Sequence, residues 1–72
     1  MADDEKAKLR TLLGYWIEHN EEHSQEFREW ADKATASGEA EAGGDMLAAA
    51  KEMERANEFL SRALSRLGGK GS

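Results

Sequence analysis

Apolar residues recur along the first half of the chain at alternating steps of four and three. This is the spacing of a helix that packs along one line against another helix, and we call the residues on that line the seam. No proline interrupts residues 3–36, and most of these residues favour helix. The pattern predicts one long amphipathic helix over residues 3–36. Its predicted seam consists of Leu9, Leu13, Trp16, Asn20, His23, Phe27, Trp30 and Ala34.

A second row with the same spacing follows a glycine-rich stretch. Gly38 suits the left-handed end of a helix, and Asp45 offers an N-cap side chain for a helix that follows it. The second seam consists of Met46, Ala50, Met53, Asn57, Leu60, Leu64 and Leu67. We therefore expect a single helical-hairpin domain over residues 1–72, with a turn over 37–44, a helix over 45–67 and a flexible tail over 68–72.

Two seams of matching length predict an all-α fold, an antiparallel two-helix hairpin. If the turn is centred near residue 40, residues whose numbers add up to about 80 face each other. This register sets Trp16 against Leu64 and His23 against Asn57. On the flanks it sets Glu26 against Glu54, and Glu18 against Arg62 as an ion pair.

Further apolar residues lie off the seams. Ala49, Ala56 and Ala63 recur every seven residues on one flank of the second helix, and Phe59 points away from its seam. A chain of 72 residues buries only a small core by itself. We expect a homodimer that forms a four-helix bundle; the alternative is that these are scattered surface residues, which are common in monomers.

Composition narrows the partners and the chemistry. The net charge of -5 argues against nucleic acid, whose phosphates require clustered Lys and Arg. The absence of cysteine excludes disulfides and thiolate chemistry. No apolar run approaches the ~20 residues of a membrane span, and acidic residues follow Met1 where a signal peptide would be basic. We expect a cytoplasmic protein without membrane or nucleic-acid partners.

Candidate metal chemistry is confined to a short stretch that holds both histidines. His19 and His23 are four residues apart and therefore lie on one face of a helix, and Glu26 adds a carboxylate one turn later. We predict that His19, His23 and Glu26 bind a divalent transition metal such as nickel, cobalt or zinc, with Glu54 or Glu58 assisting from the second helix. The alternative is a purely architectural polar layer of Asn20, His23 and Asn57 that fixes helix pairing.

Catalysis is not expected. The run from His19 to His23 has the H-x-x-E-H order of some zinc peptidases, but those enzymes carry it on much larger scaffolds with a substrate cleft. The chain has no glycine-rich phosphate loop and no serine placed to act as a nucleophile. We therefore assign no catalytic or cofactor-binding residues beyond the metal ligands.

The motif W-I-E-H-N-x-x-H, formed by Trp16, Ile17, Glu18, His19, Asn20 and His23, resembles a small uncharacterised prokaryotic helical-hairpin domain associated with nickel-binding accessory proteins. The resemblance spans most of the chain. Relatives with this motif carry Pro-His where this chain has Gly14-Tyr15, so Tyr15 replaces one nitrogen ligand. The resemblance implies a small binding module that handles or traffics a transition metal. The alternative function is a protein–protein interaction homodimer with an architectural polar layer.

Overall fold

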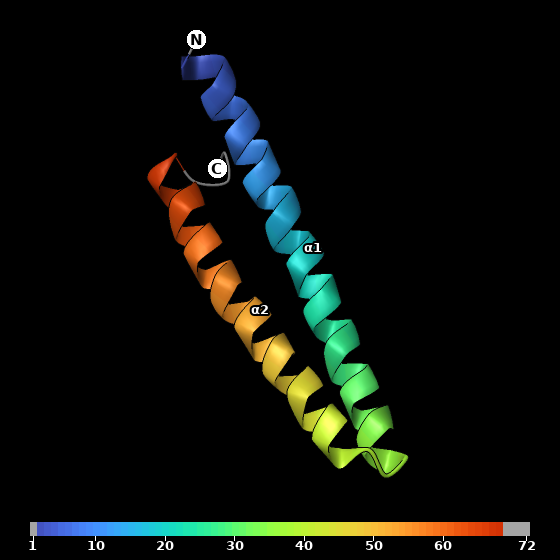
Figure 1. Ribbon diagram of the computed structural model, residues 1–72. Helices are drawn as coiled ribbons and strands as arrows, with labels where there is room; N and C mark the ends of the chain where they lie inside the picture. The colour runs from blue at the N-terminus through green and yellow to red at the C-terminus, as the bar shows by residue number, and fades with distance from the viewer. Residues whose placement is uncertain (1, 69–72) are drawn as a thin grey trace.

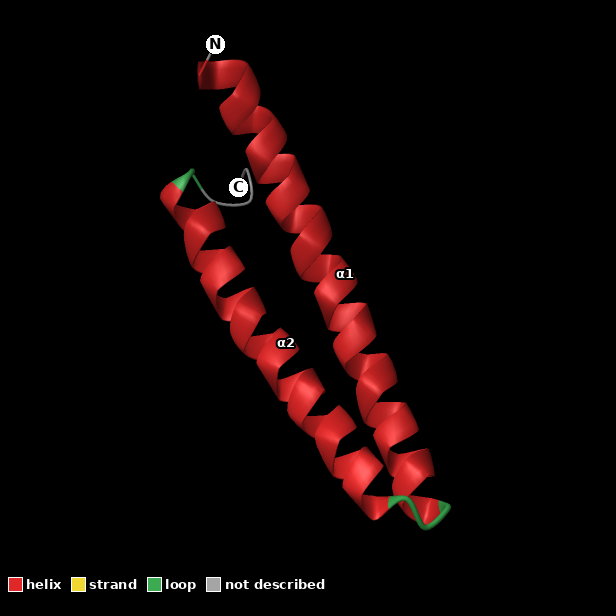
Figure 2. Cartoon of the chain, in the orientation of Figure 1, coloured by secondary structure: helices red, strands yellow, loops and turns green. Residues whose placement is uncertain are grey.

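The computed structural model describes residues 2–68, which form two antiparallel helices, α1 (Ala2–Ala36) and α2 (Ala40–Arg66), as Figures 1 and 2 show. The molecule is a rod of 54 × 19 × 14 Å. Its length follows from the ~1.5 Å rise per residue of α1. The predicted all-α hairpin is confirmed. Neither helix in residues 2–68 is long and apolar enough to cross a lipid bilayer.

The chain reverses direction through a Schellman motif at the end of α1. The Glu39 N–H donates to the Ala34 carbonyl at 2.8 Å, and the Gly38 N–H donates to the Thr35 carbonyl at 3.0 Å. Gly38 has a φ of +93°, a left-handed conformation that glycine adopts without steric cost. The predicted role of Gly38 is therefore confirmed, and only residues 37–39 lie between the two helices.

The second helix begins at Ala40, earlier than the sequence predicts. The N-cap is Glu39, without a side-chain capping bond, so the prediction of Asp45 as the N-cap is wrong. The physical reason is that the Schellman motif completes the reversal in three residues. Residues 40–44 are then free to continue as helix, and Gly43 is buried against α1 rather than placed in a loop.

The seam of α2 lies where the sequence predicts it, and Gly43 extends it towards the turn. The seam of α1 is only half as predicted: Leu13, Asn20, Phe27 and Ala34 face α2, but the other members do not. At each of the four wrongly assigned positions, the next residue along the chain faces α2 instead. The observed seam of α1 consists of Arg10, Leu13, Ile17, Asn20, Ser24, Phe27, Ala31 and Ala34.

Close approach of the helices explains this rotation of α1. Near the turn the contact is made by small residues, since Ala31 and Ser24 are buried in α1 and Gly43 and Ala50 are buried in α2. An indole ring at the position of Ala31 would hold the helices apart, which a three-residue turn does not allow. Two rows one residue apart share the same spacing, and packing selects the row with the smaller side chains.

The register is also shifted from the predicted one. Asn57 bonds to Asn20 rather than facing His23, and Arg10 reaches Leu67. Facing residues therefore add up to about 77 instead of about 80, because the turn is centred on residue 38. The predicted facing of Glu26 and Glu54 is wrong for the same reason.

The far end of the hairpin is closed by a side chain from α1. Arg10 donates from Nη1 to the Leu67 carbonyl at 2.9 Å, at the C-cap of α2. A cation at this position satisfies a free carbonyl and opposes the negative end of the helix dipole. The first residues of α1 extend beyond this contact (Figure 1). Most of the predicted tail, residues 69–72, lies outside the described residues.

Two adjacent glycines provide a matched test of the close approach. A Cβ added at Gly43 would collide with Thr35 Oγ1 and lie 2.9 Å from the Ala31 carbonyl oxygen, whereas a Cβ at Gly44 would meet nothing within 4 Å. We expect Gly43→Ala to lower the free energy of unfolding by about 1–3 kcal/mol despite its better helix propensity. Gly44→Ala should raise it by up to about 1 kcal/mol. Urea unfolding followed by circular dichroism measures both, and equal effects would contradict this account of the turn.

Candidate functional site

The polar layer inside the hairpin consists of amides. Asn20 donates from Nδ2 to Asn57 Oδ1 at 2.9 Å, and Asn57 donates from Nδ2 to the Ile17 carbonyl at 2.9 Å. Asn57 is only 9% exposed. Within residues 2–68, no buried side-chain nitrogen or oxygen lacks a hydrogen-bond partner. The described hairpin therefore pairs every buried polar side-chain atom of the amide layer by itself.

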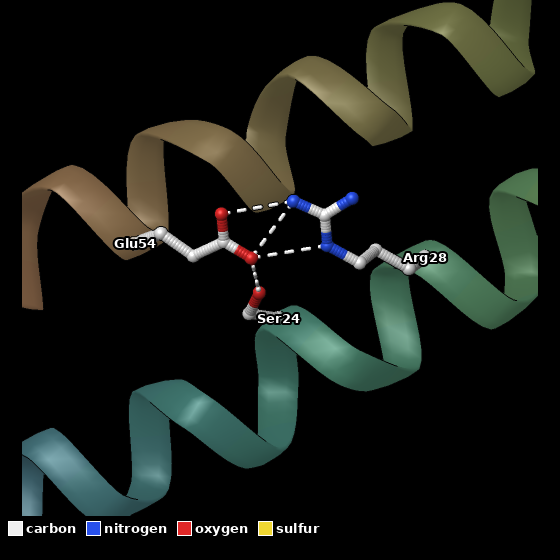
Figure 3. A network of polar contacts seen from close by, with 3 residues as sticks. All are labelled: Ser24, Arg28 and Glu54. Carbon is white, nitrogen blue, oxygen red and sulfur yellow. Dashed lines mark hydrogen bonds and ion pairs between the residues drawn. The ribbon is translucent and has the colours of Figure 1, made fainter.

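A second cross-helix contact joins Ser24 and Arg28 of α1 to Glu54 of α2 (Figure 3). Glu54 accepts hydrogen bonds from Arg28 Nε at 3.0 Å and Arg28 Nη2 at 2.8 Å, and from Ser24 Oγ at 2.9 Å. The Arg28 and Ser24 hydrogen bonds lower the pKa of the Glu54 carboxyl below its ordinary value. Glu54 is therefore occupied as the ion-pair partner of Arg28, and its assisting role towards a metal stays a prediction.

The two histidines lie outside the seam. The prediction that His23 sits between the helices opposite Asn57 is wrong, because the rotation of α1 puts Ser24 in the seam in place of His23, and Asn20 is the residue that faces Asn57. His23 is half-buried on the flank, and His19 is exposed. Tyr15, His19, His23 and Phe27 form a continuous ladder of rings along α1, with neighbouring centroids 5.5, 4.5 and 6.1 Å apart.

The imidazoles nevertheless approach each other closely. His19 Nε2 and His23 Nε2 are 3.1 Å apart, and His23 Nδ1 lies 3.4 Å from Glu26 Oε1. The three residues that the sequence singles out are thus neighbours, but Glu26 contacts the far nitrogen of His23. Within residues 2–68, no three or more His, Asp or Glu side chains gather in a geometry that could hold a metal ion. The metal assignment stays a prediction.

The hairpin has one apolar face. The residues that directly precede Arg10, Ile17 and Ala31 of the seam are Leu9, Trp16 and Trp30, which are 40%, 41% and 57% exposed. Helical geometry puts the residues that precede the seam of α2 on the same side of the hairpin. The residues that precede its four buried seam residues are all alanines, whereas Asp45, Glu52, Phe59 and Arg66 precede the other four. We define the apolar face by Leu9, Trp16, Trp30, Ala42, Ala49, Ala56 and Ala63; His23 lies in the same row.

The opposite side is polar. Residues that directly follow the seam lie there, including Gly14, Glu21 and Arg28 of α1 and Glu54 and Ser61 of α2. A shallow groove on this side is lined by Gly14, Ile17, Glu18, Glu21, Ser61, Leu64 and Ser65. Sequence reasoning identified the alanine row of α2, but it assigned Trp16 and Trp30 to the core and so missed the α1 half of the apolar face. The sequence did hold a signal for this face. Two rows of residues with the same spacing run along α1, one residue apart, and a helix can bury only one such row against its partner.

Comparisons with known proteins identify a family but no function. Residues 9–67 match the family model described as Domain of unknown function (DUF8180). No curated protein and no solved structure matches the chain. The match covers both seams, the apolar face and the two histidines. It confirms the predicted resemblance to an uncharacterised domain, whereas the association with nickel-binding accessory proteins stays a prediction.

The amide layer can be tested by removing one partner or both. Asn57→Ala leaves the Asn20 amide without its acceptor, so we expect a loss of about 1–3 kcal/mol in the free energy of unfolding. The double variant Asn20→Leu/Asn57→Leu removes both polar groups and should be close to neutral or stabilising, with a less specific register. Urea unfolding gives the energies. A single variant as stable as the parent would contradict the role of the amide pair.

Proposed function

The chain belongs to the DUF8180 family, and we propose that this hairpin is a protein-interaction module that acts through its apolar face and pairs there with a second copy of itself. The observation that carries the proposal is the row of exposed large side chains along α1, opposite a row of alanines along α2 on the same face. Monomeric proteins rarely leave a continuous apolar surface of this kind uncovered.

The exposed area supports an interface of ordinary size. A compact monomer of 8.0 kDa exposes about 4,450 Å², whereas this chain exposes 5399 Å². The excess is roughly 900–1,000 Å². One partner of a standard protein–protein interface buries about 800 Å². Covering the apolar face with a second hairpin would therefore bring the surface of each subunit close to that of a compact domain.

The thin core of the single hairpin supports the same conclusion. Its buried apolar side chains are Leu13, Ala31, Ala50 and Leu64, of which two are alanines. No large side chain in residues 2–68 is completely buried. A core of this size gives little stability to a domain of about 70 residues, and natural proteins of this length commonly gain the remainder by association. The apolar face supplies the missing contact layer.

Side-chain size favours one arrangement of the two copies. With the two-fold axis parallel to the helices, α1 of each copy packs on α2 of the other, and large residues meet alanines at both contacts. The two rows share a seven-residue period, so this arrangement needs no shift along the axis. A perpendicular axis would pair α1 with α1 and α2 with α2, which places indoles against indoles and splays the two hairpins. We therefore propose a four-helix bundle with antiparallel neighbours.

Residues at the edges of the interface follow from this arrangement and the observed register. Leu12 falls level with Arg66 of the second copy, His19 with Phe59, and Lys33 with Asp45. The Lys33 and Asp45 charges are complementary. Glu26 falls level with Glu52, which is the like-charged pair on this edge. Exposed pairs of either sign contribute only about 0–1 kcal/mol, so the apolar contacts dominate the association.

A charge on the apolar face should disrupt the dimer. We expect Trp16→Glu to weaken association by at least about 30-fold, because a central aromatic anchor commonly contributes about 2 kcal/mol or more. Tyr15→Glu is the matched control, since Tyr15 is an adjacent aromatic, 58% exposed, on the outer side of α1. Sedimentation equilibrium gives the mass of each variant. A parent mass near 8.0 kDa at high micromolar concentration would overturn the proposal.

The arrangement itself can be tested with disulfides, because the chain has no cysteine of its own. Leu12→Cys and Arg66→Cys lie on opposite outer edges of one hairpin, but they adjoin each other between copies in the proposed bundle. An equimolar mixture of the two variants should form a mixed disulfide under mild oxidation, whereas neither variant alone should do so efficiently. Glu18→Cys, on the polar side, replaces Leu12→Cys as the control. Rapid self-linking of the Leu12→Cys variant would favour the perpendicular axis and contradict our arrangement.

A further inference from the structure

The His19 and His23 pair has a property that helix packing does not require. Neither ring takes part in the seam, and both reach along the same side of α1 so that their Nε2 atoms are 3.1 Å apart. We propose that these two nitrogens form a chelating site for a borderline divalent transition ion, of which Zn²⁺, Ni²⁺ and Co²⁺ are the candidates. The site uses α1 alone, so the ion can bind without a second copy, although the proposed dimer would lie over the row that contains His23.

The separation of the two nitrogens suits one shared ion. Metal–nitrogen bonds of ~2.0–2.1 Å put two imidazole ligands about 3.3 Å apart in a tetrahedral site and about 2.9 Å apart in adjacent octahedral positions. The observed distance of 3.1 Å lies between these values. The side chains therefore need to move by only a few tenths of an ångström. Histidines one helical turn apart are already held on the same face by the backbone.

Glu26 fits the role of a positioning residue rather than a ligand. Its Oε1 lies 3.4 Å from His23 Nδ1, on the side of the ring opposite His19. The nearby carboxylate favours a hydrogen on His23 Nδ1, which leaves the Nε2 lone pair free for a metal, as around many metal-bound histidines. With His23 in this tautomer and no metal, a hydrogen on His19 Nε2 would bridge the two rings. Metal binding replaces this hydrogen, which moves to His19 Nδ1, so no net proton is released from two neutral rings.

The surroundings of the pair point to an exchangeable site. His23 and Glu26 have side chains that are 41% and 64% exposed, and His19 is exposed as well. Within residues 2–68, no third histidine or carboxylate completes a ligand set. Two protein nitrogens leave at least two positions of a four-coordinate ion to water or to an incoming ligand, as in sites that keep an open position. An ion held in this way exchanges readily with another carrier.

Isothermal titration of the tag-free chain with Zn²⁺ and Ni²⁺ tests the proposal, with Mg²⁺ as the probe that imidazoles should not bind. We expect one ion per chain. Loss of a residue that only hydrogen-bonds a metal ligand costs roughly 10- to 100-fold in metal affinity. His19→Ala and His23→Ala each remove a ligand and should therefore lower the affinity by more than this. Glu26→Gln should lower it less than either. Glu22→Gln, an exposed neighbour without a contact to the rings, is the matched control and should bind as the parent does.

Thermal unfolding of the same proteins gives a second readout. An ion that binds only the folded helix raises the melting temperature, so Zn²⁺ should stabilise the parent and the Glu22→Gln variant but neither histidine variant. Circular dichroism verifies that every variant keeps its helices. Absence of heat in the parent, or equal affinity in the parent and His19→Ala, would overturn the site. If the chain binds metal but sediments as a monomer, the metal site is supported and only the proposed dimer fails.

Discussion

The short distance between the two helices at the turn is the constraint on which the rest of the structure depends. A Schellman motif reverses the chain in three residues, and Gly43 then packs directly against the backbone of α1. Only small side chains fit between helices that start this close together, which is why Ala31 and Ala50 are buried there. The rotation of α1 about its own axis is fixed at this end and is carried along its whole length by the regular helix.

That rotation determines which polar side chains of α1 lie between the helices and which lie outside. The Asn20 amide lies inside, where it pairs with Asn57, and the Ser24 hydroxyl lies beside it against Glu54. The imidazoles of His19 and His23 lie outside, where they contact each other instead of α2. The architectural role that sequence reasoning gave to a mixed layer of amides and imidazoles therefore belongs to the amides alone. The histidines make no contact that holds the two helices together in the seam.

The same rotation gives the hairpin two faces of different chemistry. The polar side carries the Arg28–Glu54 ion pair and a groove whose lining includes two glutamates and two serines. The other side carries the indoles of Trp16 and Trp30 beside a row of alanines. A single contact layer between two helices can bury only one row of each helix, so a second apolar row implies a second contact. His23 lies in the row of that face and His19 lies at its edge, so the proposed association and the proposed metal site share one surface.

The sequence by itself determined the two helices, their antiparallel pairing, the left-handed glycine at the turn and the seam of α2. These features follow from local spacing and backbone preference, which act within a few residues. The sequence did not determine which of two overlapping rows of α1 faces α2, because Trp16 and Ile17, or Trp30 and Ala31, are equally apolar. The sequence also did not determine where α2 starts or the register of the two helices. Gly43 favours a loop by its local preference, and only its contact with α1 shows that it belongs to the helix. Those choices depend on the volume available between the helices, and only the packed tertiary structure sets that volume.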